Sequence, residues 1–226
     1  MRTRVKICGL TRETDVDAAV AAGADAVGFV FYDKSPRCVS IQQAQRLVRR
    51  LPAWVAGVGL FVNTPRSVIL RVSDQVGLSH IQLHGDESPE DCAGLGRPVI
   101  KAIRVVADDL VPGHLAQRVA PYMDCQAVLF DADSAAFGGS GRSFDWSVLA
   151  GAFDKAPGLA GTWVLSGGLE SGSVGRAISQ VSPPCVDVSS GVEQREGGAP
   201  VKGLKDAQRI DEFIAAVRAA DQRSAG

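Results

Sequence analysis

The sequence predicts an α/β fold, a single-domain (β/α)8 TIM barrel with eight parallel strands. Short apolar segments alternate with segments of helical periodicity along the whole chain, which is the pattern of parallel βαβ units with right-handed crossovers. The chain has 226 residues, and barrels of this kind typically have roughly 250. Eight such units in a chain of this length favour a closed barrel over an open doubly wound sheet. Since no linker or low-complexity segment interrupts the pattern, we expect one domain over residues 1–226.

The predicted strands are short, and most are rich in Val, Ile, Leu or Phe, as expected of strands that are buried on both faces. They cover residues 4–8, 26–31, 55–62, 80–84, 98–104, 126–131, 162–166 and 185–189.

Helical periodicity fills the intervals between these strands. In the first interval, apolar residues recur at i, i+3 and i+4 from Val16, Thr11 or Thr14 is available as the N-cap, and Gly23 is placed to end the helix. Further helices are predicted over residues 41–51, 65–76, 89–95, 108–119, 145–153, 171–179 and 205–219. The segment Gln194–Gly203 is predicted to be the loop from the eighth strand into the last helix.

Composition excludes several classes of protein. Lys plus Arg number 24 and Asp plus Glu number 25, a balance that argues against a nucleic-acid surface or an acidic tail. No run of 18 apolar residues predicts a membrane span, and the N-terminus lacks the apolar segment of a signal peptide. The five cysteines are widely spaced without a C-x-x-C motif, and the three histidines lack metal-ligand spacing. We therefore expect a cytoplasmic protein with reduced thiols, no metal site, and no nucleic-acid or membrane partner.

Two Gly-rich turns near the C-terminus indicate a phosphate site. Ser166-Gly167-Gly168 follows the apolar run at 163–165, and Ser189-Ser190-Gly191 closes the next apolar run. Small residues leave backbone N–H groups free to face an anion, and (β/α)8 barrels build phosphate sites in the loops after their seventh and eighth strands. These turns predict an enzyme that acts on a phosphorylated small molecule.

Catalytic groups of a barrel come from the carboxyl ends of its strands and the loops that follow. The predicted ends carry a thiol, two carboxylates, a histidine and two arginines, which suffice for acid–base chemistry on an anionic substrate without a metal. These ends are Cys8, the 32–37 loop with Arg37, Asn63, His84, Arg104, Asp131, Ser166 and Asp187.

Six motifs occur in order along the chain and together carry a family resemblance. They are VKICGLT at 5–11, GFVFY at 28–32 with KSPR at 34–37, QLHG at 82–85, GGSGRSFDW at 138–146, LSGGL at 165–169 and VDVSSGVE at 186–193. The set resembles the phosphoribosylanthranilate isomerases from residue 5 to about residue 206.

The resemblance implies an Amadori rearrangement in tryptophan biosynthesis, carried out by a (β/α)8 barrel without a cofactor. The substrate N-(5-phosphoribosyl)anthranilate becomes 1-(2-carboxyphenylamino)-1-deoxyribulose 5-phosphate. A general acid protonates the furanose ring oxygen and opens the ring to a Schiff base, and a general base then removes the C2 proton. The oligomeric state is not predicted.

The motifs also imply roles for individual residues. Cys8 corresponds to the general base, Asp131 to the general acid, and Arg37 to the residue that holds the anthranilate carboxylate. The phosphate would be held by small residues of the two turns, namely Gly167, Gly168, Ser190 and Gly191.

The residue types fit these roles on physical grounds. A thiol is a usable base at neutral pH if a neighbour lowers its pKa, and Lys6 lies on the same face of the strand as Cys8. We therefore hypothesise that the Lys6 ammonium favours the thiolate. Burial of Asp131 would withhold solvent from its ionised form, as an acid at neutral pH requires. The planar fork of Arg37 suits a carboxylate.

Alternatives remain at several positions. Asp133 lies on the same face as Asp131 and is a rival for the general acid. Asp187 is a candidate for substrate binding, but a structural role in which it pairs with Lys6 is favoured. His84 either contacts substrate or is satisfied by loop backbone. Arg142 stands where the resemblance leads us to expect lysine, and the 194–203 segment is longer than usual for the family.

Three other functions are weighed against the isomerase. A related aminoaldose isomerase of histidine biosynthesis would carry an aspartate at the end of the first strand, where this chain has Cys8. A barrel lyase that makes indole-glycerol phosphate would need a lysine and glutamate set at strand ends. A non-catalytic phosphometabolite-binding barrel would show degraded acid–base positions, whereas Cys8, Arg37 and Asp131 occur together.

Overall fold

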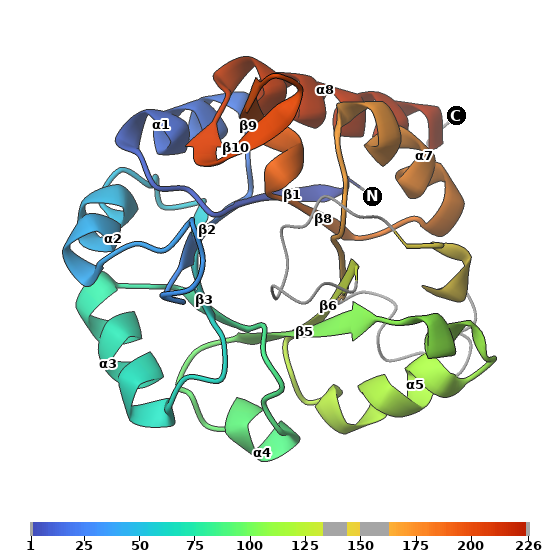
Figure 1. Ribbon diagram of the computed structural model, residues 1–226, viewed down its shortest axis with the longest axis horizontal. Coiled ribbons are helices and arrows are strands. Elements are labelled where there is room, and N and C mark those ends of the chain that lie inside the picture. Colours follow the sequence, from blue (N-terminus) through green and yellow to red (C-terminus); the bar gives the residue numbers. More distant parts are fainter. Residues whose placement is uncertain (1, 133–143, 150–162, 225–226) are drawn as a thin grey trace.

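Eight parallel strands close into a barrel in the computed structural model, which describes residues 2–132, 144–149 and 163–224 (Figure 1). Neighbouring strands pair in sequence order, and β1 also pairs with β8, which closes the barrel. The strands are β1 (Arg4–Cys8), β2 (Ala26–Val30), β3 (Ala56–Phe61), β4 (His80–Leu83), β5 (Val99–Val105), β6 (Ala127–Ala132), β7 (Trp163–Leu165) and β8 (Cys185–Val188). The predicted fold class is confirmed, and each strand lies where the sequence predicts it.

The helices form an outer ring around the barrel (Figure 1). They are α1 (Glu13–Ala22), α2 (Ile41–Val48), α3 (Arg66–Val76), α4 (Pro89–Cys92), α5 (His114–Val119), α7 (Ser171–Val181) and α8 (Ala207–Ser224). Residues 147–149 are also helical, and the rest of the helix predicted at 145–153 lies outside the described residues from 150 onward. No helix in the described ranges is long and apolar enough to cross a membrane.

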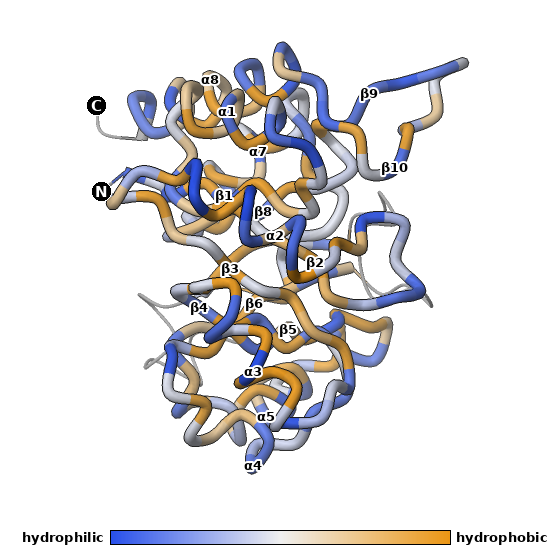
Figure 2. The backbone as a smooth tube through the Cα atoms, turned by 90° about the vertical axis from the view of Figure 1, so that its left-hand side faces the viewer, coloured by the Kyte–Doolittle hydropathy of each residue, from blue (hydrophilic) through white to orange (hydrophobic). Residues whose placement is uncertain are grey.

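Alternation along each strand separates two environments. On β1, Val5 and Ile7 belong to the large core between strands and helices, whereas Cys8 packs with Val30 and Leu60 inside the barrel. Successive side chains of a strand point to opposite faces, so Cys8 and its i−2 neighbour share the interior. Figure 2 shows apolar residues along the strands and hydrophilic residues at the edges of the molecule. The same alternation directs the polar residues of β4, β6 and β8 into the barrel.

At α1, the predicted C-terminal end is confirmed and the predicted N-cap is wrong. Gly23 ends the helix in the left-handed conformation (φ 92°), and its N–H donates to the carbonyls of Ala19 and Val20, as the sequence predicts. The expected threonine N-cap is wrong, because the N-cap is Arg12 and its side chain makes no capping bond. The hydroxyl of Thr11 instead donates to the carbonyl of Gly203 (2.6 Å).

The segment predicted as one helix at 108–119 is divided. A 3₁₀ turn at Ala107–Leu110 precedes Pro112 and Gly113, and α5 begins only at His114. Gly113 adopts φ 88°, and proline lacks the N–H that a continuous helix would use. These two residues therefore break the helix.

The segment Gln194–Gly203 is not a loop, so that prediction is wrong. It forms most of an antiparallel hairpin, β9 (Glu193–Glu196) and β10 (Ala199–Lys205), which projects from the body of the barrel (Figure 2). Gly197 and Gly198 both have positive φ (55° and 86°), as tight hairpin turns require. Since β10 includes Lys205, the last helix begins at Ala207 and not at 205.

Candidate active site

Four predicted site residues lie at the carboxyl ends of barrel strands or directly after them. Cys8 ends β1, His84 follows β4, Asp131 is near the end of β6, and Asp187 lies on β8. All four are buried. The structure therefore brings thiol, imidazole and carboxylate groups to one end of the barrel interior.

Asp187 forms an ion pair with Lys6 inside the barrel. The two residues are register partners on β8 and β1, and Lys6 Nζ donates to Asp187 Oδ1 at 2.7 Å. Ser166 Oγ, in the first Gly-rich turn, donates to Asp187 Oδ2 at 3.1 Å. Burial alone would lower the pKa of Lys6, but the charges of Asp187 and Cys8 outweigh it and raise that pKa. The predicted pairing of Asp187 with Lys6 is confirmed.

Cys8 is packed against Gly28 of β2, and any larger residue at position 28 would displace the Cys8 side chain. A Cβ at Gly28 would lie 2.7 Å from Cys8 Sγ and 3.2 Å from Lys6 Nζ. Burial raises the pKa of the Cys8 thiol; the nearby Lys6 ammonium lowers it and the Asp187 carboxylate raises it. Lys6 thus acts in the hypothesised direction, but burial outweighs it.

A hydrogen-bonded chain links Gln82, His84 and Asp131. Gln82 Nε2 lies 2.8 Å from His84 Nδ1, and His84 Nε2 lies 3.1 Å from Asp131 Oδ2. Asp131 Oδ1 accepts a bond from the backbone N–H of Ala132 (2.9 Å). Both ring nitrogens of His84 therefore contact side chains. The alternative prediction, a histidine whose hydrogen bonds are satisfied by loop backbone, is wrong.

Arg37 is buried against a carboxylate that the sequence reasoning did not single out. Its Nε and Nη2 donate to the two oxygens of Glu193, at 2.7 and 2.9 Å, in a bidentate pair. Glu193 also accepts from Lys205 Nζ (3.2 Å) and from the N–H of Gly203 (2.9 Å). The signal that could have located Glu193 is its place directly after the second Gly-rich turn.

Charge within this cluster shifts two pKa values. Burial would raise the pKa of Glu193, but the hydrogen bond and charge of Arg37 and the charge of Lys205 outweigh it and lower that pKa. For Lys205, burial dominates and lowers the pKa to about 8, although Glu193 opposes the shift. The guanidinium of Arg37 is thus held in one orientation by a fully buried, ionised partner.

The two Gly-rich turns lie against each other. Gly167 and Gly168 have positive φ (85° and 65°), and a Cβ at Gly191 would clash with the carbonyl oxygen of Leu169. A Cβ at Gly167 would lie 3.2 Å from Asp131 Oδ1. The first predicted phosphate turn thus borders the carboxylate of Asp131 on β6. Ser190 and Gly191 of the second turn lie in the 3₁₀ turn Ser190–Val192. Asp133 and the loop at 138–142 lie outside the described residues.

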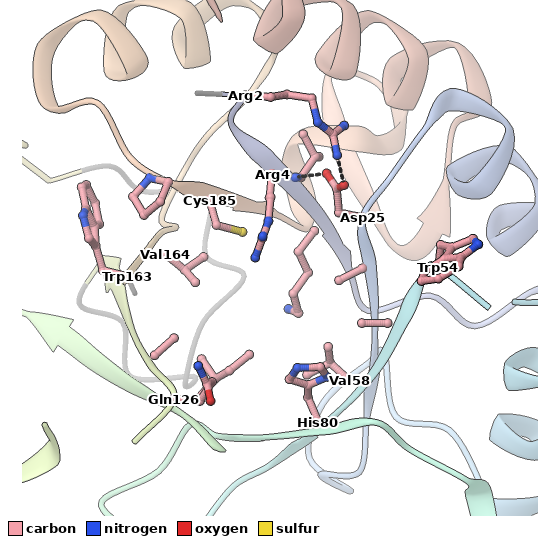
Figure 3. Close-up of a pocket in the computed structure, with 17 residues that line it drawn as sticks. Arg2, Arg4, Asp25, Trp54, Val58, His80, Gln126, Trp163, Val164 and Cys185 are labelled. Atoms are coloured by element: carbon pink, nitrogen blue, oxygen red, sulfur yellow. Dashed lines mark hydrogen bonds and ion pairs between the residues drawn. The ribbon is translucent and has the colours of Figure 1, made fainter. Parts of the chain in front are cut away.

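A separate cavity opens at the other end of the barrel (Figure 3). Its volume is about 790 Å³, and it is lined by the residues that begin the strands, together with the exposed Trp54. Arg4, His80 and Gln126 contribute polar groups to it. Barrel enzymes place their chemistry at the carboxyl ends of the strands, so this cavity opens at the end opposite the candidate site, although Lys6 is among its lining residues. In the described ranges no cluster of three or more His, Cys, Asp or Glu residues could hold a metal ion.

Acid–base side chains at the carboxyl ends of the strands, beside Gly-rich turns after β7 and β8, define a (β/α)8 barrel enzyme for phosphorylated small molecules. A family model described as N-(5'phosphoribosyl)anthranilate (PRA) isomerase matches residues 5–216. The chain belongs to this family.

Individual relatives agree with this assignment. N-(5'-phosphoribosyl)anthranilate isomerase of Bordetella petrii is 49% identical over 227 residues, covering 100% of both chains. The protein of that name from Dechloromonas aromatica is 46% identical over 223 residues, covering 98% of this chain and 99% of the relative. The solved phosphoribosyl anthranilate isomerase of Thermotoga maritima superposes with a TM-score of 0.83 at 40% identity, covering 96% of this chain and 99% of that one.

One further solved relative carries a ligand. It is a phosphoribosyl anthranilate isomerase in complex with reduced 1-(o-carboxyphenylamino)-1-deoxyribulose 5-phosphate. Its TM-score to this chain is 0.80 at 38% identity, over 96% of this chain and 99% of that one.

Proposed function

We propose that residues 1–226 form one catalytic domain that converts N-(5-phosphoribosyl)anthranilate into 1-(2-carboxyphenylamino)-1-deoxyribulose 5-phosphate in the cytoplasm, as a step of tryptophan biosynthesis. The observation that carries the proposal is the arrangement of Cys8 and Asp131, buried at the carboxyl ends of β1 and β6 in a chain of the phosphoribosylanthranilate isomerase family. The ligand of the solved relative supports this choice of substrate, because it has a carboxyphenylamino group at one end and a phosphate at the other.

In the first step, Asp131 acts as the general acid. It gives a proton to the furanose ring oxygen, the C1–O bond breaks, and the anilino nitrogen forms a cationic Schiff base with C1. The position of Asp131 supports this role, because its Oδ1 borders the first Gly-rich turn, on the side where the phosphate would be anchored.

In the second step, the thiolate form of Cys8, whose own proton has been released to solvent, acts as the general base and takes the C2 proton of the Schiff base. The electron pair of the broken C–H bond neutralises the cation and gives an enolamine, which tautomerises to the ketone. Burial raises the pKa of Cys8 in the free protein, so an added positive charge is needed to favour the thiolate. The cationic Schiff base supplies such a charge when it lies over the sulfur, in the same sense as Lys6.

The two ends of the substrate would be bound by different groups of the protein. The backbone N–H groups of Gly167, Gly168, Ser190 and Gly191 would bind the phosphate. Arg37, held by Glu193 through Nε and Nη2, would direct its remaining guanidinium edge to the carboxylate of the anthranilate ring. His84 and Asp187 would lie against the ribose of the substrate. They would keep their hydrogen bonds to Asp131 and Lys6, respectively.

The test is direct. Phosphoribosylanthranilate is generated in situ and its fluorescence is followed with the protein, with the Asp131→Asn variant, and without protein. We expect rapid loss of fluorescence with the wild-type protein only. If the wild type gives no loss above the background, or turns over only the aminoaldose of histidine biosynthesis, the proposal is wrong.

A further inference from the structure

Gln82 is a fully buried polar side chain that the mechanism above does not use. It lies on β4, two residues before His84, so both side chains point into the barrel. Its amide nitrogen lies 2.8 Å from His84 Nδ1, while its amide oxygen has no hydrogen-bond partner among the described residues. A buried amide that lacks part of its hydrogen bonding costs about 1–3 kcal/mol. A methionine of the same length would fill the space without that cost, so the bond to His84 is the distinctive contribution of this residue.

The bond from Gln82 determines where His84 carries its proton. An amide nitrogen can only donate, so His84 Nδ1 must accept and is unprotonated. A neutral imidazole then carries its single proton on Nε2, which is the nitrogen that faces Asp131 Oδ2 at 3.1 Å. His84 is therefore a donor to Asp131, and a second proton on Nδ1 would meet the N–H groups of Gln82.

This arrangement decides whether the proton of Asp131 is available for transfer. Oδ2 accepts from His84 and Oδ1 accepts from the backbone N–H of Ala132, so neither contact takes up a proton carried by the carboxyl group. Oδ1 is the oxygen that borders the first Gly-rich turn at Gly167. If His84 were protonated on Nδ1 instead, its bare Nε2 would accept the Asp131 proton and turn it away from the substrate.

We propose that Gln82 is a positioning residue that fixes the Nε2–H tautomer of His84, which prevents His84 from accepting the acidic proton of Asp131. The inference rests on the proposed role of Asp131 as the general acid. In the proton transfer, the O–H bond of Asp131 breaks, the ring oxygen of the substrate gains the proton, and His84 keeps its own proton throughout.

Among the described residues, charged groups on the neighbouring elements form ion pairs with one another. These pairs join Lys101 with Glu87, Lys6 with Asp187, and Arg104 with Asp86. Burial raises the pKa of Cys8, which is also inside the barrel. The shifts measured on His84 in the experiment below are therefore expected to respond mainly to Gln82 and Asp131.

The test is ¹⁵N NMR of the imidazole nitrogens in the ligand-free protein, with His84 assigned from the His84→Asn variant. We expect Nδ1 to be unprotonated and Nε2 protonated. In Gln82→Glu, the carboxylate can only accept, so the proton should move to Nδ1. In the matched variant Gln82→Met, which makes no such bond, both tautomers should be present. Unchanged resonances of His80 and His114 show that each variant is folded.

Kinetics provide the second readout. Since the acid step is affected and ground-state binding is not, kcat should fall while KM stays close to wild type. For Gln82→Glu we expect kcat to fall about 10²-fold, the lower end for loss of an acid–base group. For Gln82→Met we expect kcat to fall about 10-fold, the scale of one hydrogen bond. A proton on Nδ1 of His84 in the wild type, or a Gln82→Glu variant with wild-type kcat, would overturn the inference.

The two proposals fail separately. If the tautomer follows Gln82 as expected but Asp131→Asn keeps wild-type turnover, the role of Asp131 is wrong and the inference loses its catalytic consequence. If Asp131→Asn is inactive but the wild-type tautomer is Nδ1–H, only the inference about Gln82 is wrong. Should Gln82→Glu fail to fold, the wild-type spectrum and the Gln82→Met variant still decide the question.

Discussion

Lys6 and Asp187 face each other as register partners on the two strands that close the barrel, and their side chains form a buried ion pair at 2.7 Å. Lys6 lies two positions before Cys8 on the same strand. The pair therefore stabilises the closure of the barrel and also influences the pKa of the proposed base. Removal of either charge affects both the stability of the barrel and the pKa of Cys8.

Lys6→Met should destabilise the protein strongly. Breaking a buried ion pair leaves one charge without a partner and typically costs about 3–5 kcal/mol. We expect a fall of this size in the free energy of unfolding, measured by urea denaturation. Lys6→Met combined with Asp187→Asn removes both charges and should recover part of the loss. If the double variant is no more stable than Lys6→Met alone, the pair does not contribute in this way.

The proposed acid and base should each be needed for turnover. Cys8→Ala and Asp131→Asn are expected to lower kcat by about 10²-fold or more, the scale typical of acid–base groups. Both changes are small, so circular dichroism and the unfolding midpoint should stay near wild type. Near-normal turnover in either folded variant would remove that residue from the mechanism, and would direct attention to Asp133 in the case of Asp131.

Most of the barrel could be predicted because its strands are buried on both faces. Such strands read as short apolar runs, and the strand β8, Cys185–Val188, was located even with Asp187 inside it. The hairpin could not be predicted in the same way. Its outer residues 195–199 are polar or small and exposed, so no apolar alternation marked it as strand.

The candidate site was predictable where a motif carried it and not where folding assembled it. Cys8, His84 and Asp131 lie at predicted strand ends, and the structure places each of them, buried, at or directly after the carboxyl end of a barrel strand. Glu193 and Arg37 are 156 residues apart, and a lone glutamate in a sequence predicts an exposed side chain. Only the tertiary structure shows that Glu193 is fully buried between Arg37 and Lys205.

Gly28 should be intolerant of even one added methyl group. In Gly28→Ala, the new Cβ would lie 2.7 Å from the sulfur of Cys8, so the thiol must move. We expect a loss of stability of about 1–3 kcal/mol, as for overpacked cores, and a fall in kcat of about 10-fold or more, because a small misplacement of a reacting group is costly.

Gly57→Ala is the matched control for Gly28→Ala. Gly57 lies on the neighbouring strand β3, and its added Cβ would approach side-chain ends of Leu51, Val48 and Phe29, at 3.2, 3.7 and 3.9 Å. We expect its kcat to stay at the wild-type value. Equal kcat values for Gly28→Ala and Gly57→Ala would show that Cys8 does not need the space beside Gly28.

Arg37→Ala should chiefly raise KM, because it removes a group that binds the aryl carboxylate in the ground state. It also leaves Glu193 with Lys205 as its remaining charged partner, so a stability loss should accompany it. Arg37→Lys keeps the positive charge but not the bidentate fork. It therefore separates the effect on carboxylate binding from the effect on stability. If KM is unchanged and substrate analogues without the carboxylate react equally well, Arg37 has another role.

The buried ammonium of Lys205 predicts a pH dependence of stability. Burial lowers the pKa of Lys205 from 10.5 to about 8 in the folded protein. Between these values the unfolded chain binds a proton that the folded protein does not, so the free energy of unfolding rises with pH there, by at most about 1.4 kcal/mol per pH unit. Below pH 8 both states are protonated, and the penalty of burying the charge is present in full.

Comparison with Lys205→Met isolates this effect from other titrating groups. The stability of the wild type minus that of the variant should be constant below about pH 8 and should increase as the pH rises toward 10.5. Urea denaturation at a series of pH values measures both proteins. The carbonyl and hydroxyl of Ser189, which accept bonds from Lys205 Nζ at 2.9 and 3.2 Å, can still accept from a neutral amine. A difference that stays flat or falls across this range would mean that Lys205 remains charged in the folded protein, held by Glu193.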